Sequence, residues 1–172
     1  CLYCSFTSYP IFSWEKRVSE YLTALEKEID FVSSFYQDKI LDTIYIGGGT
    51  PTTLKAPELE RLLSYIEEKL DLSHLQEFTV EAGRADSITR DKLEVLRKHG
   101  VTRISVNPQT MNQKTLDLIG RRHTVEQVRE AFTLAREIGF TNINMDIILG
   151  LPEETEADVQ YTIDEIVKMQ PD

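Results

Sequence analysis

The chain has 172 residues, of which 41% are hydrophobic and 28% charged, and its formal net charge is −10. This composition suits a folded domain and is not that of a disordered or low-complexity chain. The acidic balance disfavours a nucleic-acid partner, which needs a basic surface, and no apolar run reaches the ~18 residues that span a bilayer. A local basic pocket for an anionic small molecule stays compatible with this balance.

Residues 14–36 carry apolar side chains at helical spacing and predict a long amphipathic helix. Beyond them, short apolar or alternating runs that predict strands take turns with helical patterns. In chain order, these elements are a strand at 41–46, a helix at 57–70, a strand at 76–81, a helix at 89–99, a strand at 101–106, a short helix near 112–119, a helix at 124–138, a strand at 142–149 and a helix at 155–169. Thr89 and Thr124 are predicted N-caps, and Gly100 and Gly139 are predicted helix stops.

Strands that alternate with helices at this spacing predict parallel pairing through right-handed crossovers. No linker or shift in composition divides the chain, so residues 1–172 are predicted to form one domain. The periodicity leaves two α/β architectures open, which are an open doubly wound sheet and a complete or partial barrel. In both, functional residues gather at the carboxyl ends of the strands.

Polar and glycine-rich segments stand at each of these predicted strand ends. Gly47-Gly48-Gly49-Thr50-Pro51 follows the first strand, Glu81 closes the second, Asn107-Pro108-Gln109 follows the third, and Asp146 lies in the last half of the fourth. The Cys1–Cys4 loop precedes the first helix and therefore also occupies the position of a strand end. One edge of the sheet is thus predicted to collect thiols, a glycine turn, an amide and carboxylates.

Each of these residues also has a purely structural interpretation. The glycines suit a tight turn, Glu81 a solvated strand end and Gln109 a cap for the helix near 112. A carboxylate at Asp146, within an apolar strand, is costly unless it is hydrogen-bonded. The glycine run is not a dinucleotide fingerprint, because Thr52 stands where the third glycine is needed, and no Walker A sequence is present. The run does expose backbone groups that can receive a ligand's amino or carboxylate group.

Both cysteines of the chain lie in one C-x-x-C motif, Cys1-Leu2-Tyr3-Cys4. With no other cysteine to pair with, they disfavour a disulfide framework and favour a reducing, cytoplasmic location. The motif alone is consistent with half a zinc site or a redox pair. However, His74, His99 and His123 are too scattered to complete a zinc site, and too many polar strand ends follow for a thioredoxin-like fold.

The combination of segments is more specific than any one of them. Cys1-Leu2-Tyr3-Cys4 resembles the second half of the C-x-x-x-C-x-(aromatic)-C motif of radical S-adenosylmethionine (SAM) enzymes, and the glycine run resembles that superfamily's turn for the methionine amino group. Within the superfamily, the chain resembles the oxygen-independent coproporphyrinogen III oxidase family with its haem-chaperone relatives, and most of all the HemZ-type coproporphyrinogen dehydrogenases. This likeness rests on four segments: Val80-Glu81-Ala82-Gly83-Arg84, Asn107-Pro108-Gln109-Thr110-Met111, Gly120-Arg121-Arg122-His123 and 144–152.

The resemblance implies an α/β fold, an incomplete (β/α)6 partial TIM-like barrel with outer helices, together with a [4Fe–4S] cluster and SAM. It makes Cys1 and Cys4 two of three thiolate ligands, with the first motif cysteine four positions before Cys1. It also implies the SAM contacts: Gly48, Gly49, Thr50, Pro51 and Glu81 at the amino group, Arg121 at the carboxylate, Gln109 and Asp146 at the ribose hydroxyls, and Tyr3 near the adenine.

The chain also departs from the family pattern. Many oxygen-independent coproporphyrinogen oxidases have another cysteine two positions after the third motif cysteine, where this chain has Phe6, as the chaperone branch does. We expect the chain to be truncated at both ends, without the first strand and cysteine and without the last strand and C-terminal domain, and to be inactive alone. Arg121 also suits a helix C-terminus, Arg84 an exposed surface and His123 a helix entry.

The leading hypothesis is a radical SAM oxidoreductase that oxidatively decarboxylates coproporphyrinogen III propionates to vinyls in haem biosynthesis. By resemblance, an electron from the cluster cleaves SAM, the deoxyadenosyl radical abstracts a hydrogen from the propionate β-carbon, and CO₂ leaves. The implied partners are a tetrapyrrole substrate and an electron-donor protein such as a flavodoxin or ferredoxin. The alternatives are a haem chaperone on the same scaffold, a radical SAM enzyme with another substrate, and a SAM-free α/β binding module.

Overall fold

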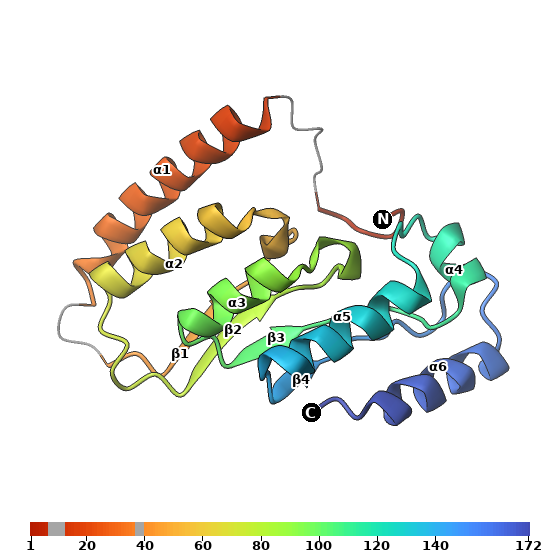
Figure 1. Ribbon diagram of the computed structural model, residues 1–172. Helices are drawn as coiled ribbons and strands as arrows, with labels where there is room; N and C mark the ends of the chain where they lie inside the picture. The colour runs from red at the N-terminus through yellow and green to blue at the C-terminus, as the bar shows by residue number, and fades with distance from the viewer. Residues whose placement is uncertain (7–12, 37–39) are drawn as a thin grey trace.

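The computed structural model describes residues 1–6, 13–36 and 40–172. Within them, strands form one parallel sheet in the order β1 (Thr43–Ile46), β2 (Glu77–Glu81), β3 (Arg103–Ser105) and β4 (Asn142–Asn144) (Figure 1). Each strand pairs with the one before it in the chain, without the reversal of order that marks a doubly wound sheet. This order is that of a barrel wall, so the predicted partial barrel is confirmed over the doubly wound alternative.

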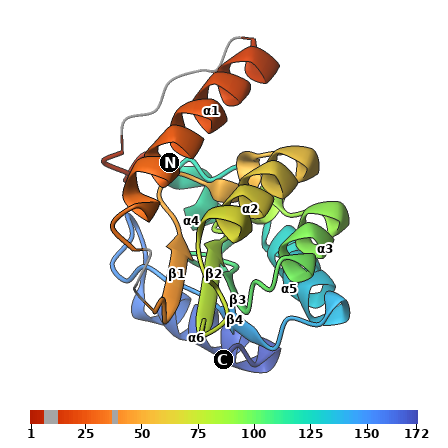
Figure 2. The same ribbon diagram turned by 90° about the vertical axis from the view of Figure 1, so that its left-hand side faces the viewer.

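The helices between the strands lie on one face of the sheet, as Figures 1 and 2 show for α2 (Ala56–Lys69), α3 (Arg90–Lys98) and α5 (Val125–Ile138). This one-sided layer follows when successive right-handed crossovers all wind in the same direction. The other helices and the 3-10 turns are α1 (Trp14–Ser33), α4 (Gln113–Leu118), α6 (Glu156–Met169), η1 (Pro51–Thr53) and η2 (Ala85–Ser87). In the described residues, no helix has the length and apolar character needed to cross a membrane.

The ends of the predicted elements shift by a few residues, and their capping residues are largely confirmed. Gly139 directly follows α5 and Gly100 follows the C-cap residue His99 of α3, and their φ angles are positive, at 99° and 72°. The Thr124 hydroxyl caps α5 by accepting a backbone N–H at 3.2 Å. Thr89 precedes α3 as predicted, but its hydroxyl bonds the Asp91 carboxylate instead of capping the helix backbone.

The predicted fourth strand is wrong in its second half, because β4 ends at Asn144. Asp146 therefore lies beyond the strand, where it is exposed. Its backbone N–H donates to the side-chain oxygen of Asn107 at 3.0 Å rather than to a neighbouring strand. Pro108, next to Asn107, has no N–H with which to continue the ladder. Pairing between the two segments resumes only at an isolated bridge further along.

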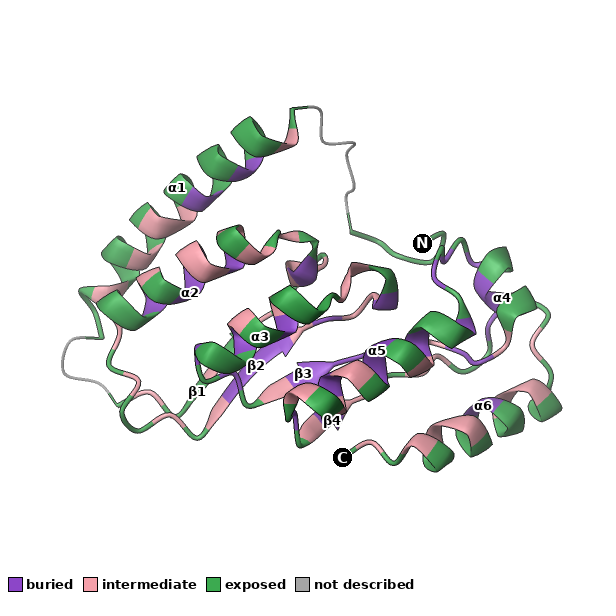
Figure 3. Cartoon of the chain, in the orientation of Figure 1, coloured by how far each residue is buried: buried purple, intermediate pink, exposed green. Residues whose placement is uncertain are grey.

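The main core fills the space between the sheet and its helices (Figure 3). The strand residues that point into this core are apolar and buried: Phe78, Val80, Ile104 and Ile143. One row on the opposite face, in register across the strands, is polar: Tyr45, Thr79, Arg103 and Asn142. Strands of parallel sheets usually carry apolar residues on both faces. The polar row therefore lines the inner face of the barrel wall, with Thr79 buried within it and bonded to Glu77.

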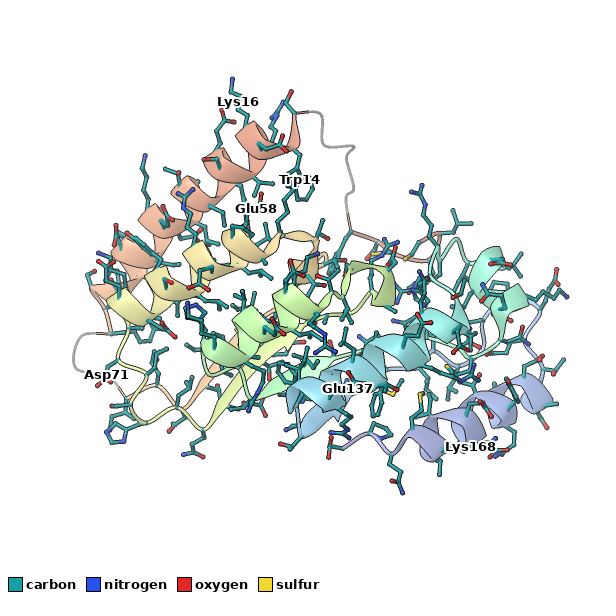
Figure 4. The ribbon with its side chains drawn as sticks, viewed as in Figure 1. Trp14, Lys16, Glu58, Asp71, Glu137 and Lys168 are labelled. Carbon is teal, nitrogen blue, oxygen red and sulfur yellow. The ribbon has the colours of Figure 1, made fainter. Side chains whose placement is uncertain are left out.

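Helix α1 packs on α2 rather than on the sheet and extends the helical layer outward (Figure 2). Apolar residues of both helices form a second, small core: Val18, Leu22, Leu62 and Ile66. Trp14 Nε1 donates to Glu58 Oε1 at 3.2 Å, and the two side chains point toward one another (Figure 4). Arg61 holds Glu26 through two hydrogen bonds of 2.6 and 2.7 Å. These contacts fix the first helix after the cysteines.

Candidate cofactor site

The carboxyl ends of the strands bring the predicted site residues to one edge of the sheet. Glu81, the last residue of β2, pairs in register with Ser105 of β3, and Ser105 pairs with Asn144 of β4. The glycine turn directly follows β1, and Asp146 lies just beyond β4. Neighbouring strands therefore place the glycine turn, Glu81 and Asp146 along the same edge.

Glu81 holds the glycine turn in place. Gly48 has a φ of 109° and donates its N–H to Glu81 Oε2 at 3.1 Å, while the Tyr45 hydroxyl donates to Oε1. A Cβ at Gly47 would lie 2.5 Å from the Tyr45 ring, so a side chain there would displace that ring. A Cβ at Gly48 or Gly49 would meet nothing within 4 Å. The backbone of these two glycines is therefore open to a ligand.

The contact between Tyr45 and Glu81 is expected to be visible in a tyrosine titration. The hydrogen bond to Glu81 raises the pKa of Tyr45 from 10.0 to about 12, because the tyrosinate would lose this bond and face the carboxylate charge. We expect Tyr45 to give the latest phase of a titration followed by ultraviolet absorbance, and Glu81→Ala to move that phase to lower pH. Tyr45→Phe, which deletes the phase, is the control. A late phase that persists unchanged in Glu81→Ala would contradict the contact.

The Asp146 carboxylate accepts hydrogen bonds from two side-chain amides. Its Oδ2 accepts from Asn107 Nδ2 at 2.9 Å, and its Oδ1 accepts from Asn144 Nδ2 at 2.7 Å. Because the carboxylate is exposed, the desolvation cost expected of a carboxylate inside an apolar strand does not arise. The two amides instead hold it in one orientation at the edge of the sheet.

Gln109 adopts a left-handed backbone conformation, with a φ of 68°, which is uncommon for a residue other than glycine. Its N–H donates to the Asp146 carbonyl at 3.1 Å, and its carbonyl accepts from the Ile148 N–H at 2.9 Å. The interpretation of Gln109 as a helix cap is wrong, because Asn112 is the N-cap of α4 and accepts from the Thr115 N–H. Gln109 is instead bonded to Asp146 through the backbone.

The cysteine loop docks on the end of α4. The Leu2 N–H donates to the Ile119 carbonyl at 2.8 Å, and the Cys4 N–H closes a turn onto the Cys1 carbonyl at 3.4 Å. Both thiols are free and exposed. Arg121 Nη1 reaches Cys1 Sγ at 3.6 Å, although the two residues are 120 positions apart in the sequence. The loop is thereby joined to the edge of the sheet that carries the other site residues.

Arg121 is the buried cation of the site, with an exposed fraction of 6%. Its Nη2 donates to the carbonyls of Gly83, at 3.1 Å, and Asn107, at 3.3 Å, and so ties together the loops after β2 and β3. The guanidinium thus bonds these loops rather than the last carbonyls of α4. Its buried Nε has no hydrogen-bond partner in the described part of the chain, and burial lowers its pKa. A buried guanidinium with a free donor fits an anionic group.

Three further residues lie near Arg121 and differ in their exposure. Tyr3 is 43% exposed, and its partial burial raises the pKa of the phenol while the charge of Arg121 opposes that rise. Arg84 is paired with Asp86, with Nε and Oδ1 3.3 Å apart. His123 is fully buried at the entry to α5, in keeping with its structural interpretation, and burial lowers its pKa. Of the three, Tyr3 is the one that presents a ring beside the cysteines.

The sequence assigned no role to Asn107, although the structure places it at the centre of the site. Its side chain bonds Asp146 twice, and its carbonyl accepts from Arg121. The available signal was the Asn-Pro pair directly after a predicted strand. Proline interrupts the ladder, and a polar side chain next to it can then supply an acceptor in place of a backbone carbonyl.

The resemblance implies SAM and a [4Fe–4S] cluster, and the side chains of the site fit SAM more completely than they fit the cluster. Among the described residues, no group of three or more Cys, His, Asp or Glu side chains could hold a metal ion. Cys1 and Cys4 supply two thiols, whereas three thiolates leave one iron of a [4Fe–4S] cluster open. The free donor of Arg121, the open Gly48–Gly49 backbone and the Glu81 carboxylate fit the carboxylate and ammonium ends of an amino acid. The site fits SAM, and it fits a cluster with one further thiolate.

These features define a class of protein, the (β/α) barrels that bind a cofactor at the carboxyl ends of their strands. The family model described as the radical SAM superfamily matches residues 1–166. The chain belongs to this superfamily, whose members use a [4Fe–4S] cluster and SAM. The predicted family is therefore confirmed.

Within the superfamily, the chain is similar to three proteins of known name. The oxygen-independent coproporphyrinogen-III oxidase-like protein HemZ of Bacillus subtilis is 41% identical over 100% of this chain and 35% of its own length. The haem chaperone HemW of Bacillus subtilis is 41% identical over 95% of this chain and 42% of its own length. The solved structure of the radical SAM enzyme HemN, the coproporphyrinogen III oxidase of Escherichia coli, superposes with a TM-score of 0.83 at 29% identity, over 95% of this chain and 37% of HemN. The chain thus spans less than half the length of each.

Proposed function

We propose that this chain holds the [4Fe–4S] cluster and SAM of a coproporphyrinogen III dehydrogenase, an oxidoreductase that converts propionates to vinyls in haem biosynthesis. The observation that carries the proposal is the position of Arg121. Its guanidinium contacts Cys1 Sγ and the carbonyls of the loops after β2 and β3, so one buried cation joins the cysteine loop to the strand ends. An anion-binding group beside the thiols supports a SAM carboxylate bound between them.

Cys1 and Cys4 are the proposed cluster ligands of this chain, together with a cysteine four positions before Cys1. Both thiols are free and exposed, so iron can reach them without unfolding of the loop. The cluster supplies the electron for radical chemistry on SAM, and the chain positions both cofactors and excludes competing reactions. Free thiols also suit a reducing compartment, and we therefore include a cytoplasmic location in the proposal.

The amino-acid end of SAM is proposed to lie between the glycine turn and Arg121. Glu81 and the backbone of Gly48–Pro51, which is open at the two glycines, can accept hydrogen bonds from the ammonium group. The Thr50 hydroxyl donates to the Gly49 carbonyl at 2.6 Å, and a 3-10 turn begins at Pro51, so this backbone is held in shape. Arg121 can donate its unpartnered Nε–H to the carboxylate. Both ends of the zwitterion thus find groups of opposite charge.

The nucleoside end of SAM is proposed to contact Gln109, Asp146 and Tyr3. Carboxylate and amide oxygens are acceptors for ribose hydroxyls, and the backbones of Gln109 and Asp146 are bonded directly to one another. Tyr3, which lies between the two cysteines, offers a half-exposed ring for the adenine. With its amino-acid end near Arg121, SAM would lie along the carboxyl ends of the strands.

Replacing Asp146 is expected to weaken SAM binding while leaving the cluster intact. Asp146→Ala removes the proposed ribose acceptor, and the loss of a hydrogen bond to a charged group corresponds to about a tenfold to hundredfold weaker affinity. The affinity is measured anaerobically by calorimetry, and the cluster by its visible absorbance. Asp164→Ala, at an exposed carboxylate on α6, is the matched control. Unchanged affinity in Asp146→Ala would remove this residue from the site.

The substrate is proposed to be a tetrapyrrole, and the electron donor a small redox protein such as a flavodoxin or ferredoxin. The support for the tetrapyrrole is the likeness to HemZ over the whole chain and to the oxidase HemN in structure. The polar row Tyr45–Thr79–Arg103–Asn142 on the inner face of the sheet suits a substrate with ionised propionates rather than an apolar one.

A haem chaperone on the same scaffold is the second candidate. HemW is as identical to this chain as HemZ is, although over slightly fewer residues. Phe6 also favours it, because this exposed residue stands where many of the oxidases have a further cysteine. A chaperone of this kind would bind haem without turnover of porphyrinogen.

One pair of measurements on the full-length protein with all three motif cysteines separates these functions. The reconstituted, reduced protein is incubated with SAM and coproporphyrinogen III under anaerobic conditions, and vinyl products are followed by mass spectrometry. A parallel sample is titrated with haem and followed by absorbance. Vinyl products support the dehydrogenase. Tight haem binding without vinyl products would reject it in favour of the chaperone, and neither result would reject both.

A further inference from the structure

Asn107 lies between the two halves of the proposed SAM site. Its side-chain oxygen accepts from the Asp146 backbone N–H at 3.0 Å, and its side-chain nitrogen donates to Asp146 Oδ2 at 2.9 Å. Its backbone carbonyl accepts from Arg121 Nη2 at 3.3 Å. One residue thereby bonds both the proposed ribose acceptor and the proposed carboxylate donor.

The hydrogen-bonding partners fix which end of each amide faces Asp146. The Asp146 backbone N–H can only donate, so the Asn107 oxygen must accept it and the Asn107 nitrogen must face the carboxylate. Arg103 Nη2 likewise donates to the Asn144 oxygen at 3.1 Å, which turns the Asn144 nitrogen toward Asp146 Oδ1. Both carboxylate oxygens therefore receive a donor that cannot rotate away without losing a second bond.

The two hydrogen bonds between Asn107 and Asp146 matter because Asp146 is exposed. A free carboxylate at a surface samples several rotamers, and ordering it on binding a ligand costs conformational entropy. Asn107 bonds both the backbone and the side chain of Asp146 and so selects one rotamer before the ligand arrives.

We propose that Asn107 is a positioning residue of the SAM site, which acts by holding Asp146 in the orientation that receives the ribose hydroxyls. The inference rests on the proposed function, because it presumes that Asp146 contacts SAM. It assigns the loss of affinity in Asn107 variants to the nucleoside end of the ligand, and not to its amino-acid end.

The test compares two ligands and two substitutions in the full-length protein with its cluster reconstituted. Asn107→Leu removes both side-chain bonds, and Asn107→Asp keeps the shape but sets an oxygen against the Asp146 carboxylate. We expect both variants to bind SAM about tenfold more weakly, as for one lost bond to a charged group. We expect their affinity for L-methionine, which has no ribose, to stay unchanged. Gln160→Leu, at an exposed amide on α6 that bonds Asp164 rather than Asp146, is the matched control.

A double-mutant cycle decides whether Asn107 acts through Asp146. In the Asp146→Ala background, Asn107→Leu is expected to cause no further loss of SAM affinity, because there is no carboxylate left to position. A further tenfold loss would overturn the inference, and so would equal weakening of SAM and L-methionine, since that pattern marks general distortion. Unchanged SAM affinity in Asn107→Leu would also overturn it. If the unsubstituted protein binds no SAM, the proposed function itself fails, which is a separate and recognisable result.

Discussion

Cys4→Ala is expected to abolish assembly of the cluster in the full-length protein. Three thiolates hold a [4Fe–4S] cluster at three irons, and loss of one of them leaves two irons without a protein ligand. The exposed Cys4 thiol has no substitute close by, because no group of three potential metal ligands occurs in the described ranges. We therefore expect iron and sulfide contents to fall to the background level after anaerobic reconstitution, with loss of the visible absorbance of the cluster.

The matched control for Cys4→Ala is Ser5→Ala, which alters the next residue and leaves both thiols in place. This control separates ligand loss from disturbance of the loop, which docks on α4 through the Leu2 N–H. Four irons per chain in Cys4→Ala would contradict the assignment of Cys4 as a ligand. The far-ultraviolet circular dichroism of both variants should match that of the unsubstituted protein, because the cysteine loop contributes no residue to the main core.

The second large effect is expected at Arg121, where Arg121→Met should weaken SAM binding about a hundredfold or more, as for loss of a buried charge pair with a carboxylate. Stability should change little by comparison. The substitution deprives the Gly83 and Asn107 carbonyls of a donor, but it also removes a buried charge whose Nε is unpartnered in the described chain. Calorimetry of SAM binding and thermal unfolding of the same samples check both halves of this prediction.

Arg122→Met is the control for Arg121→Met, because Arg122 is the adjacent arginine and is exposed. Arg121→Lys adds a finer comparison, since lysine keeps the positive charge but lacks the planar fork of the guanidinium. We expect its affinity for SAM to lie between those of the unsubstituted protein and Arg121→Met. Equal SAM affinity in Arg121→Met and the unsubstituted protein would take the carboxylate contact away from this residue.

The order of elements could be predicted because local signals and the fold agree. Apolar periodicity located the helices, and Gly100 and Gly139 end theirs at the positive φ angles that glycine adopts most readily. The choice of a barrel could not be made from periodicity, because it depends on which strands are neighbours. The observed order β1-β2-β3-β4 decides it.

The fourth strand shows where pattern reasoning fails. The apolar run after Asn142 reads as one strand, yet β4 stops at Asn144 because the Asn107 side chain takes the Asp146 N–H that a ladder would use. No local signal near residue 146 reveals a partner that lies 39 positions earlier. The same interaction that shortened the strand also gave Asp146 its orientation.

The residues of the candidate site likewise differ in whether local sequence patterns could predict their positions. Glu81 and the glycine turn could be expected at one edge, because parallel strands end together. Arg121 could not, because it follows a helix rather than a strand and reaches Cys1 only when α4 folds against the cysteine loop. Its place in the prediction came from resemblance to a family, and its contacts supply the physical reason for that place.

The most direct test of the account is whether the protein cleaves SAM reductively. The full-length protein with all three motif cysteines is reconstituted with iron and sulfide, reduced with dithionite and mixed with SAM under anaerobic conditions, and 5′-deoxyadenosine is measured by chromatography. We predict 5′-deoxyadenosine in the unsubstituted protein, none in Cys4→Ala and much less in Arg121→Met at the same SAM concentration. A fully loaded cluster that yields no 5′-deoxyadenosine, with or without coproporphyrinogen III, would contradict it.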